Sequence, residues 1–303
     1  QQIQTQNMKA IILDGKKPAQ DIRNEIKAEV NRLTFLGLRP PHLVAILVGD
    51  DPASHTYVKG KMRACREVGF QSTNKRHPAS TTEQELLGWV NTYNEDPLVD
   101  GILVQMPLPA HIIPQNITKT IVPYKDADGF HPLNVGLMTL NFPGILPATP
   151  AGILELLDRY EIPTKGKHCV VAGRSRIVGR PMSILMSRGG KPGEATVTLC
   201  HRYTHPEVLK QMPLQADIVI VAVGIPGLIT ADMVKEGAVV IDVGINRVPA
   251  PEKKSGYRLV GDVDFEAVAE KASYFTPVPG GVGPMTVAML LSNTMKAYKR
   301  SHG

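Results

Sequence analysis

The sequence predicts an α/β protein, with a parallel β layer in its first half and a doubly wound parallel sheet in its second. Short apolar runs of strand length alternate with longer segments in which apolar residues recur at helical spacing. In the second half, two of the apolar runs end in glycine, at Gly224 and Gly244. Successive buried strands that end in this way are typical of a sheet that binds its ligand at the carboxyl ends of the strands.

The first half supplies the elements of the first layer. Apolar residues recur every three or four positions in the first predicted helix. The second helix follows a Gly-Asp-Asp-Pro-Ala-Ser turn and ends at Gly69, and Thr81 or Thr82 is expected to cap the third. We expect strands at 8–13, 42–48 and 99–104, and helices at 18–36, 54–68 and 82–94.

The second half begins after a stretch, 112–149, in which frequent Pro, Asn and Gly weaken the pattern. Thr149 and Pro150 then open a helix, because proline is favoured in the first helical turn. We expect helices at 151–160, from about 181 to 187 and at 285–295, and strands at 167–172, 195–199, 217–223 and 238–243.

Composition excludes several classes of protein. Hydrophobic residues make up 43% of the 303-residue chain and charged residues 20%, and no apolar run is long enough to span a bilayer. The first seven residues lack the basic and apolar regions of a secretory signal. The three cysteines, Cys65, Cys169 and Cys200, have no paired spacing, which favours a reducing cytoplasm over a disulfide framework or a zinc site.

The net charge of +6 does not indicate a nucleic-acid partner, because the basic residues are dispersed and aromatic residues are few. A mildly basic cleft for an anionic small molecule explains this charge equally well. The acidic segment Lys125-Asp-Ala-Asp-Gly-Phe could be a turn or a metal loop. No later Glu completes a calcium-binding pattern, so we predict no metal site.

A dinucleotide site is indicated where the strand at 167–172 meets Gly173 and the following helix. Gly173 and Gly179 lie six residues apart, so the generic G-x-G-x-x-G fingerprint fails. Arg174 follows the first glycine and Arg202 follows the next strand, and both favour the 2′-phosphate of NADP, unless they are ordinary surface charges. The segment from Gly244 to Asn246 is expected to touch the nicotinamide side.

A second group of residues suggests a catalytic half. Tyr57 and Lys61 share one face of a predicted helix, which on spacing alone is more often an amphipathic surface. Gln105 follows a buried strand, so its polar side chain points to the usual ligand crevice. Six of the eight residues in Pro277–Pro284 are Pro or Gly. This composition predicts a stiff loop that a flat ligand can approach closely, although such clusters are often simple connections.

Together these motifs resemble the bifunctional methylenetetrahydrofolate dehydrogenase/methenyltetrahydrofolate cyclohydrolase family, from about Met8 to Tyr298. Any one of them is modestly specific, whereas five in order over nearly 300 residues are highly specific. The motifs are Tyr57-Val-Lys-Gly-Lys61, Val104-Gln105-Met-Pro-Leu-Pro, Lys125-Asp-Ala-Asp128-Gly, Gly173-Arg-Ser-x-x-Val-Gly-x-Pro181 and Pro277-Val-Pro-Gly-Gly-Val-Gly-Pro-Met-Thr286.

The resemblance implies two α/β domains around a cleft, a folate-binding catalytic domain (8–148 with 285–303) and a Rossmann-type NADP domain (149–284). It places the essential lysine at Lys61, its glutamine partner at Gln105, the stacking tyrosine at Tyr57 and the pterin-binding aspartate at Asp128. The Pro/Gly loop would line the folate pocket beside the nicotinamide. Further substrate contacts are implied at Val104, Met106, Pro279, Gly280 and Gly281, and cofactor contacts at Gly173, Arg174, Ser175, Ile177, Arg202, Gly244 and Ile245.

The implied activity is NADP⁺-dependent oxidation of 5,10-methylenetetrahydrofolate, followed by hydrolysis of the methenyl product to 10-formyltetrahydrofolate, in a cytoplasmic homodimer. Some members of the family have Ser where this chain has Arg202, so the resemblance does not specify the contact of Arg202 with the 2′-phosphate. Two other readings keep the fold: another NADP dehydrogenase, such as a hydroxy-acid or shikimate type, or a non-catalytic NADP-binding regulator. The folate-type loop, Tyr57 and Lys61 argue against the first, and the intact set of Lys61, Gln105 and Asp128 argues against the second.

Overall fold

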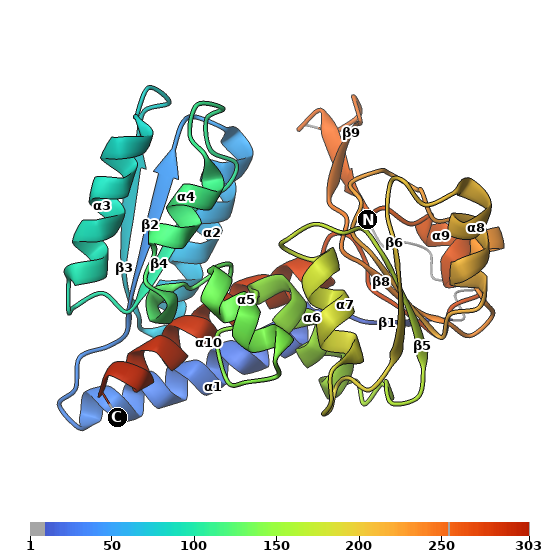
Figure 1. The fold of residues 1–303 in the computed structure, drawn as a ribbon, viewed down its shortest axis with the longest axis horizontal. Helices are drawn as coiled ribbons and strands as arrows, with labels where there is room; N and C mark the ends of the chain where they lie inside the picture. Colours follow the sequence, from blue (N-terminus) through green and yellow to red (C-terminus); the bar gives the residue numbers. More distant parts are fainter. Residues whose placement is uncertain (1–9, 254, 303) are drawn as a thin grey trace. The chain divides into compact units, whose positions relative to one another are not determined.

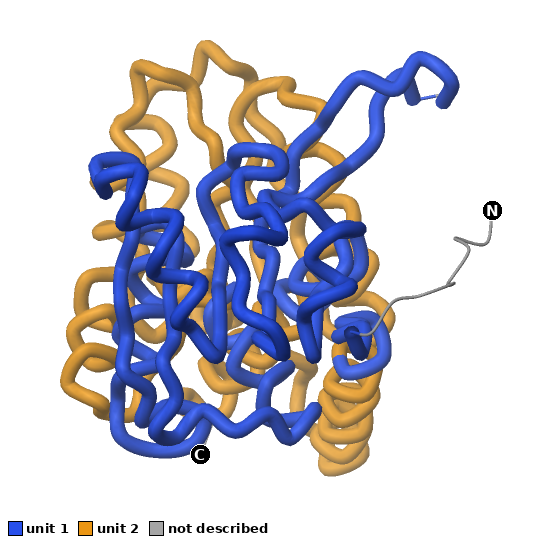
Figure 2. Tube along the Cα trace, turned by 90° about the vertical axis from the view of Figure 1, so that its right-hand side faces the viewer, with its two compact units in different colours: residues 1–18, 149–286 blue, residues 19–148, 287–303 orange. Residues whose placement is uncertain are grey.

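The computed structural model describes residues 10–253 and 255–302, which divide into two compact units. Unit 1 contains the described residues up to Pro18 together with Thr149–Thr286. Unit 2 contains Ala19–Ala148 and the chain from Val287 onward. Figure 2 colours the two units along the chain trace. The chain therefore crosses between units three times, after Pro18, after Ala148 and after Thr286.

Unit 2 is built on a three-stranded parallel sheet with the strand order β3-β2-β4, as far as the described residues extend. Every residue of the central strand is buried, which explains its continuous apolar sequence HLVAILV. Val44, Ile46 and Val48 on one face pack with Leu86 and Val90 from a helix of the same unit. The elements are β2 (His42–Val48), α2 (Pro52–Val68), β3 (Gln71–His77), α3 (Glu83–Glu95) and β4 (Gly101–Val104), with α1 (Lys16–Phe35) from Ala19 onward and α10 (Val282–His302) from Val287 onward (Figure 1).

The predicted helix ends in unit 2 rest on specific caps. The side chain of Asp51 accepts a hydrogen bond from the Ser54 amide at 2.7 Å, so α2 begins at Pro52, two residues earlier than the sequence predicts. Thr82 and Glu85 form a reciprocal capping box at the start of α3, which confirms Thr82 as the cap. Each cap satisfies amide groups that the first turn of a helix leaves without partners.

The sequence prediction missed several elements of unit 2. Strand β3 has the polar sequence QSTNKRH, because it lies at the edge of the sheet and most of its side chains are exposed or half-buried. The stretch 112–149, predicted to be irregular, contains three short helices that begin with proline. They are α4 (Pro114–Thr120), η1 (Pro123–Lys125) and α5 (Pro132–Thr139).

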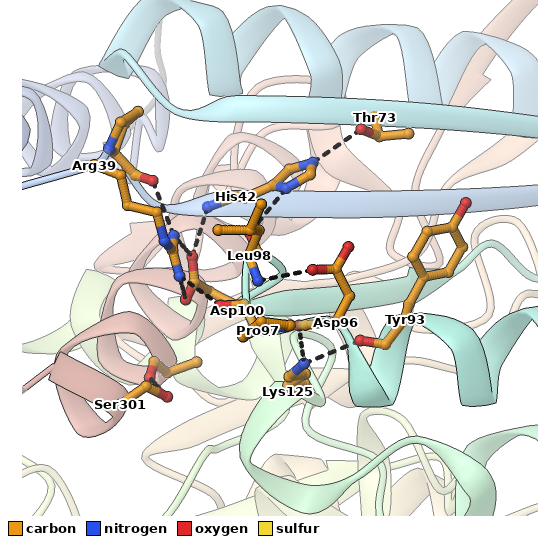
Figure 3. Close-up of polar contacts among 12 residues, drawn as sticks. Arg39, His42, Thr73, Tyr93, Asp96, Pro97, Leu98, Asp100, Lys125 and Ser301 are labelled. Carbon is orange, nitrogen blue, oxygen red and sulfur yellow. Dashed lines mark hydrogen bonds and ion pairs between the residues drawn. The ribbon is translucent and has the colours of Figure 1, made fainter.

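A polar network holds the amino-terminal end of this sheet (Figure 3). Arg39 donates two hydrogen bonds to the carboxylate of Asp100, at 2.7 and 2.9 Å, and the same carboxylate accepts the amide of His42. Asp100 is 3% exposed, so its charge is paired out of solvent. The buried Lys125 ammonium donates to three backbone carbonyls at the end of α3, and burial lowers its pKa. These contacts fix the end of the sheet opposite to Gln105.

Unit 1 contains a six-stranded parallel sheet with the order β1-β11-β8-β7-β5-β6 in the described part of the chain. The strand order reverses at β5, the first strand of this half of the chain, as in a doubly wound sheet. The strands are β1 (Ile11–Ile12), β5 (His168–Ala172), β6 (Thr196–Cys200), β7 (Ile218–Val221), β8 (Val239–Asp242) and β11 (Tyr274–Phe275).

Helices cover both faces of this sheet (Figure 1). On one face, apolar residues of α8 and α9 join a core with the buried valines of β5, β7 and β8. On the other, Met182, Leu185 and Met186 of α7 are fully buried. The elements are α6 (Ala148–Arg159), α7 (Gly179–Ser187), α8 (Pro206–Leu214), η2 (Ala231–Met233) and α9 (Phe265–Ala269). The predicted fold class, α/β with a doubly wound parallel sheet in the second half, is confirmed.

Several details of unit 1 differ from the sequence prediction, which also lacked helices α8 and α9. The strand predicted at 8–13 covers only Ile11–Ile12 in the structure, and residues 8 and 9 lie outside the described residues. Strand β1 pairs with β11, so the described residues up to Pro18 group with unit 1, whereas the expected domain boundaries placed 8–18 in the folate-binding half. An antiparallel hairpin, β9 (Asn246–Pro249) with β10 (Tyr257–Val260), was not predicted, since its side chains are exposed or half-buried.

Candidate active site

Helix α2 of unit 2 presents Tyr57 and Lys61 one turn apart. Tyr57 is 48% exposed, so a flat ligand can reach its ring. Lys61 is half-buried. The two side chains therefore differ in exposure and chemistry: Tyr57 has an aromatic ring exposed to solvent, and Lys61 has a half-buried amine.

Lys61 is held by Gln105, 44 positions along the chain. The Lys61 Nζ donates to Oε1 of Gln105 at 3.0 Å, and Gln105 Nε2 donates to the backbone carbonyl of Met106 at 2.7 Å. Gln105 follows β4 directly and is 9% exposed, so its amide is oriented by the end of a buried strand. Val104, which ends that strand, is 4% exposed and belongs to the core beneath. The predicted pairing of Lys61 with Gln105 is thus present as a direct contact.

Asp128 lies in the same unit, after η1. Burial raises the pKa of its carboxyl group to about 6, the positive charge of Lys61 opposes that rise, and the charge of Asp126 adds to it. The preceding segment is rigid, because Asp126 accepts hydrogen bonds from the amides of Gly129 and His131 and from the side chain of Asn134. Asp128 is therefore a carboxyl group of shifted pKa on a fixed loop.

The Pro/Gly run lies in unit 1, and its conformation is tight. The Gly281 amide donates to the carbonyl of Pro277 at 2.9 Å, and Gly280 adopts a φ of 110°. Pro279 is exposed, whereas Gly280 and Gly281 are buried. Helix α10 begins at Val282 rather than at Met285, so the loop proper is shorter than predicted and Pro284 stands in the first turn of a helix.

The loop after β5 folds around Ser175. Its hydroxyl accepts the amides of Val178 and Gly179, at 3.1 and 3.3 Å, and its backbone carbonyl accepts the Arg180 amide. An ideal Cβ on Gly179 would lie 1.9 Å from the carbonyl oxygen of Gly173. The spacing of the two glycines therefore reflects a close approach between the start of α7 and the end of β5.

Two arginines meet on one ring beside this loop. The guanidinium carbons of Arg174 and Arg202 lie 5.4 and 4.6 Å from the centroid of the Tyr203 ring. Arg202 also donates to the Tyr203 hydroxyl at 2.6 Å. Both arginines, with Gly173 and Ser175, line a cavity of about 670 Å³ at the carboxyl ends of β5, β6 and β7. Such an edge is where doubly wound sheets bind nucleotides.

The cavity does not bring together every residue predicted to bind the cofactor. Ile177, Gly244 and Ile245 are not among its lining residues. Ile177 and Ile245 are 50% and 45% exposed, whereas Gly244 is buried after β8. The contact of Tyr203 with both arginines was not predicted. Its position directly after Arg202 in the sequence was the one signal for it.

Comparison with known protein families assigns the chain to one of them. Residues 147–302 match the family described as tetrahydrofolate dehydrogenase/cyclohydrolase, NAD(P)-binding domain. Residues 13–128 match tetrahydrofolate dehydrogenase/cyclohydrolase, catalytic domain. The chain belongs to the tetrahydrofolate dehydrogenase/cyclohydrolase family. The resemblance drawn from the five motifs is thereby confirmed.

Similar members of this family match over nearly their whole length. The bifunctional protein FolD of Flavobacterium psychrophilum is 58% identical over 290 residues, which cover 96% of this chain and 98% of the relative. The crystal structure of FolD from Campylobacter jejuni has a TM-score of 0.89 at 49% identity, over 96% of this chain and 99% of that one. The FolD of Trypanosoma brucei, solved with NADP and an inhibitor, has a TM-score of 0.92 at 39% identity, over 97% of this chain and 98% of that one.

Neither a metal-binding cluster nor a membrane-spanning helix is present among the described residues. In residues 10–253 and 255–302, no group of three or more His, Cys, Asp or Glu side chains has an arrangement suited to a metal ion. None of the described helices combines the length and apolar composition that crossing a bilayer requires.

Proposed function

We propose that this chain oxidises 5,10-methylenetetrahydrofolate with NADP⁺ and hydrolyses the methenyl product to 10-formyltetrahydrofolate, with Lys61, Gln105, Tyr57 and Asp128 acting on the folate. The observation that carries this assignment is the 3.0 Å contact between Lys61 and Gln105 at the end of β4, within the matched catalytic domain. It joins an amine to a fixed amide, and the charge of this amine lowers the pKa of the Asp128 carboxyl group, which burial raises. Membership of the family supplies the two reaction types.

Unit 1 fits NADP by its own chemistry. The cavity at the strand ends is lined by Gly173, Arg174, Ser175 and Arg202, and the two guanidinium groups converge on Tyr203. Two permanent positive charges in the lining of one cavity suit the doubly charged 2′-phosphate, which NAD lacks. NADP⁺, when bound, accepts the hydride that leaves the methylene carbon. We assign the 2′-phosphate to Arg174 and Arg202, and the nicotinamide side to Gly244 and Ile245.

In the hydrolysis, Lys61 accepts a proton from the attacking water. Oxidation leaves a cationic methenyl carbon, and Lys61 acts as the base toward the water that attacks this carbon. Water adds to the carbon and Lys61 takes one of its protons. One carbon–nitrogen bond then breaks as its nitrogen takes up the proton that remains on the added hydroxyl, and the oxygen becomes the carbonyl of the formyl product. Gln105 fixes the amine through the 3.0 Å contact. Tyr57 stacks on the substrate, and Val104 and Met106 flank Gln105.

Asp128 is assigned to the pterin, because an ionised carboxylate pairs with two parallel N–H donors on one ring edge. With a pKa near 6, Asp128 is ionised above that pH and neutral below it. We therefore expect kcat/KM for the folate substrate to fall as the pH drops below 6, and Asp128→Asn to lower kcat/KM and to remove this limb of the profile. An unchanged acidic limb in Asp128→Asn would contradict the assignment.

The same carboxyl group makes stability depend on pH. Its folded pKa of about 6 exceeds the ordinary 3.8, so the native state binds more protons than the unfolded state between these values. The free energy of unfolding should therefore decrease as pH rises through this window. Denaturant titrations of wild type and Asp128→Asn at several pH values measure the difference.

The loop before α10 is expected to serve both reactions. A Cβ on Gly281 would lie 2.7 Å from the Pro277 carbonyl oxygen and 2.8 Å from the Thr276 Cβ, so Gly281→Val must displace the loop. We expect both activities to fall at least about tenfold, since a misplacement of about 1 Å can cost a hundredfold. Steady-state assays of each reaction measure the effect. If both activities survive, the loop is only a connector.

We also propose that the enzyme works as a cytoplasmic homodimer. The three cysteines are free and buried, which suits a reducing compartment. Strand β6 (Thr196–Cys200) ends the described six-stranded sheet, and an edge strand offers main-chain groups to a second copy. Sedimentation equilibrium of the purified chain distinguishes dimer from monomer.

A further inference from the structure

Two aspartates lie side by side in the interior of unit 1, and neither has a role in the chemistry above. Asp242 ends β8 and is 2% exposed, and Asp262 follows the hairpin β9–β10 and is fully buried. Carboxylates are costly to bury and need strong partners. Their contacts show what they hold in place.

Asp262 joins the loop after β7 to the start of the hairpin. Its Oδ2 accepts the successive amides of Val223 and Gly224, at 2.7 and 2.9 Å. Its Oδ1 accepts Nδ2 of Asn246 at 2.8 Å. One side chain therefore fixes two segments that leave the carboxyl ends of neighbouring strands.

Asp242 extends this arrangement to two further segments. Its Oδ1 accepts the amides of Gly244 and Asp262, at 3.0 and 2.9 Å, and its Oδ2 accepts the amide of Val263 at 3.0 Å. The Asp242 amide donates to the Thr276 hydroxyl at 2.7 Å. Thr276 immediately precedes the Pro/Gly loop, so that loop is tied to the same centre.

The main chain is shaped around these carboxylates. An ideal Cβ on Gly244 would lie 2.2 Å from Oδ1 of Asp262, and one on Gly261 would lie 1.8 Å from Oδ2 of Asp242. Glycine at these two positions lets the backbone touch the acidic groups. Glycine is therefore needed at position 244 because a larger residue would collide with the buried side chain of Asp262.

We propose that Asp262, supported by Asp242, is a positioning residue of the dehydrogenase reaction: it fixes the wall of the cofactor cavity nearest to the nicotinamide. Val223, whose amide Asp262 holds, lines that cavity, and Gly244 leads into the segment assigned to the nicotinamide side. Arg174 and Arg202, assigned to the 2′-phosphate, come from other strand ends. The inference rests on the proposed NADP site of unit 1.

Because Asp262 and the two arginines act on different parts of the cofactor, we expect loss of Asp262 to impair the dehydrogenase reaction but not binding of the 2′-phosphate. In Asp262→Ala the amides of Val223 and Gly224 lose their acceptor, and the wall they form can shift. We expect kcat/KM of the dehydrogenase for NADP⁺ to fall about a hundredfold, the effect of a misplacement of about 1 Å. The affinity for 2′,5′-ADP, which carries the 2′-phosphate but no nicotinamide, should remain unchanged. Cyclohydrolase activity, assayed on the methenyl substrate without NADP, should also remain.

Two further variants complete the experiment. Asp262→Asn keeps an oxygen that can accept the two amides, so it should recover about tenfold of the lost activity. Asp264→Ala is the matched control and should retain both activities. Asp264 lies two residues further along the chain, is exposed, and makes no side-chain hydrogen bond that caps α9. Binding of 2′,5′-ADP also reports whether unit 1 of each variant is folded.

Three results would overturn the proposal. The first is a dehydrogenase rate in Asp262→Ala equal to that of wild type. The second is a parallel loss of 2′,5′-ADP binding and dehydrogenase activity, which indicates a general structural role. The third is an Asp262→Asn variant as impaired as Asp262→Ala, which indicates that the charge and not the hydrogen bonding matters. Failure of the proposed function is distinguishable, because the wild-type chain itself would then lack NADP-linked oxidation.

Discussion

Lys61→Met is expected to abolish hydrolysis of methenyltetrahydrofolate while NADP still binds. Methionine fills a similar volume but cannot accept a proton, and it leaves Oε1 of Gln105 without the donor that lies 3.0 Å away. General acid–base catalysis contributes about 10²–10⁴-fold to a reaction rate, so we expect a loss of at least this size. The decay of methenyl absorbance, measured at saturating substrate, gives the rate directly.

Lys59→Met is the matched control for this variant. Lys59 is exposed on the same helix, two residues away, and its replacement changes the net charge by the same amount. It should hydrolyse the substrate at the wild-type rate. Binding of NADP to Lys61→Met should equal that of wild type, since Arg174 and Arg202 lie in unit 1 and Lys61 in unit 2. Unchanged hydrolysis in Lys61→Met would remove Lys61 from the mechanism.

Gly179→Ala should have the opposite profile, with the dehydrogenase lost and the cyclohydrolase retained. The new Cβ would stand 1.9 Å from the carbonyl oxygen of Gly173, so the start of α7 must move away from the end of β5. That movement also breaks the contacts of the Ser175 hydroxyl with the amides of Val178 and Gly179. Because Gly173 and Ser175 line the cofactor cavity, we expect kcat/KM for NADP⁺ to fall about a hundredfold or more.

The matched control is Gly88→Ala, at an exposed position of α3 where a Cβ meets no atom within 4 Å. It should leave both activities unchanged and slightly favour the helix. The measurement is a titration of NADP⁺ in the dehydrogenase assay, with the cyclohydrolase assayed separately on the methenyl substrate. A normal KM for NADP⁺ in Gly179→Ala would show that the loop after β5 does not hold the cofactor.

The fold was predictable wherever burial dominates the sequence. The strands of the interior, such as His42–Val48 and His168–Ala172, are continuous apolar runs because helices cover both faces of the sheet. Strand β3 and the hairpin β9–β10 were not predictable, since their exposed side chains carry no apolar pattern. The short helices α4 and α5 were hidden because they begin with proline, which also signals loops.

More of the candidate site could be predicted from the sequence in unit 2 than in unit 1. Lys61 and Gln105 lie 44 positions apart, and only the order of the family motifs related them before the structure placed them 3.0 Å apart. Asp242 and Asp262 gave no signal, because one looks like the end of a strand and the other like a loop residue. Their importance comes from hydrogen bonds to main-chain groups that are distant in sequence, and no local pattern encodes such contacts.

The most direct test of the central claim, that one chain performs both reactions, is a single absorbance experiment. Purified enzyme is mixed with 5,10-methylenetetrahydrofolate and either NADP⁺ or NAD⁺, and the methenyl species is followed as it forms and decays. We predict rapid formation and decay with NADP⁺ and slower formation with NAD⁺, and in Lys61→Met we predict accumulation without enzymatic decay. Absence of the methenyl species with both cofactors, or decay in Lys61→Met at the wild-type rate, would contradict the account.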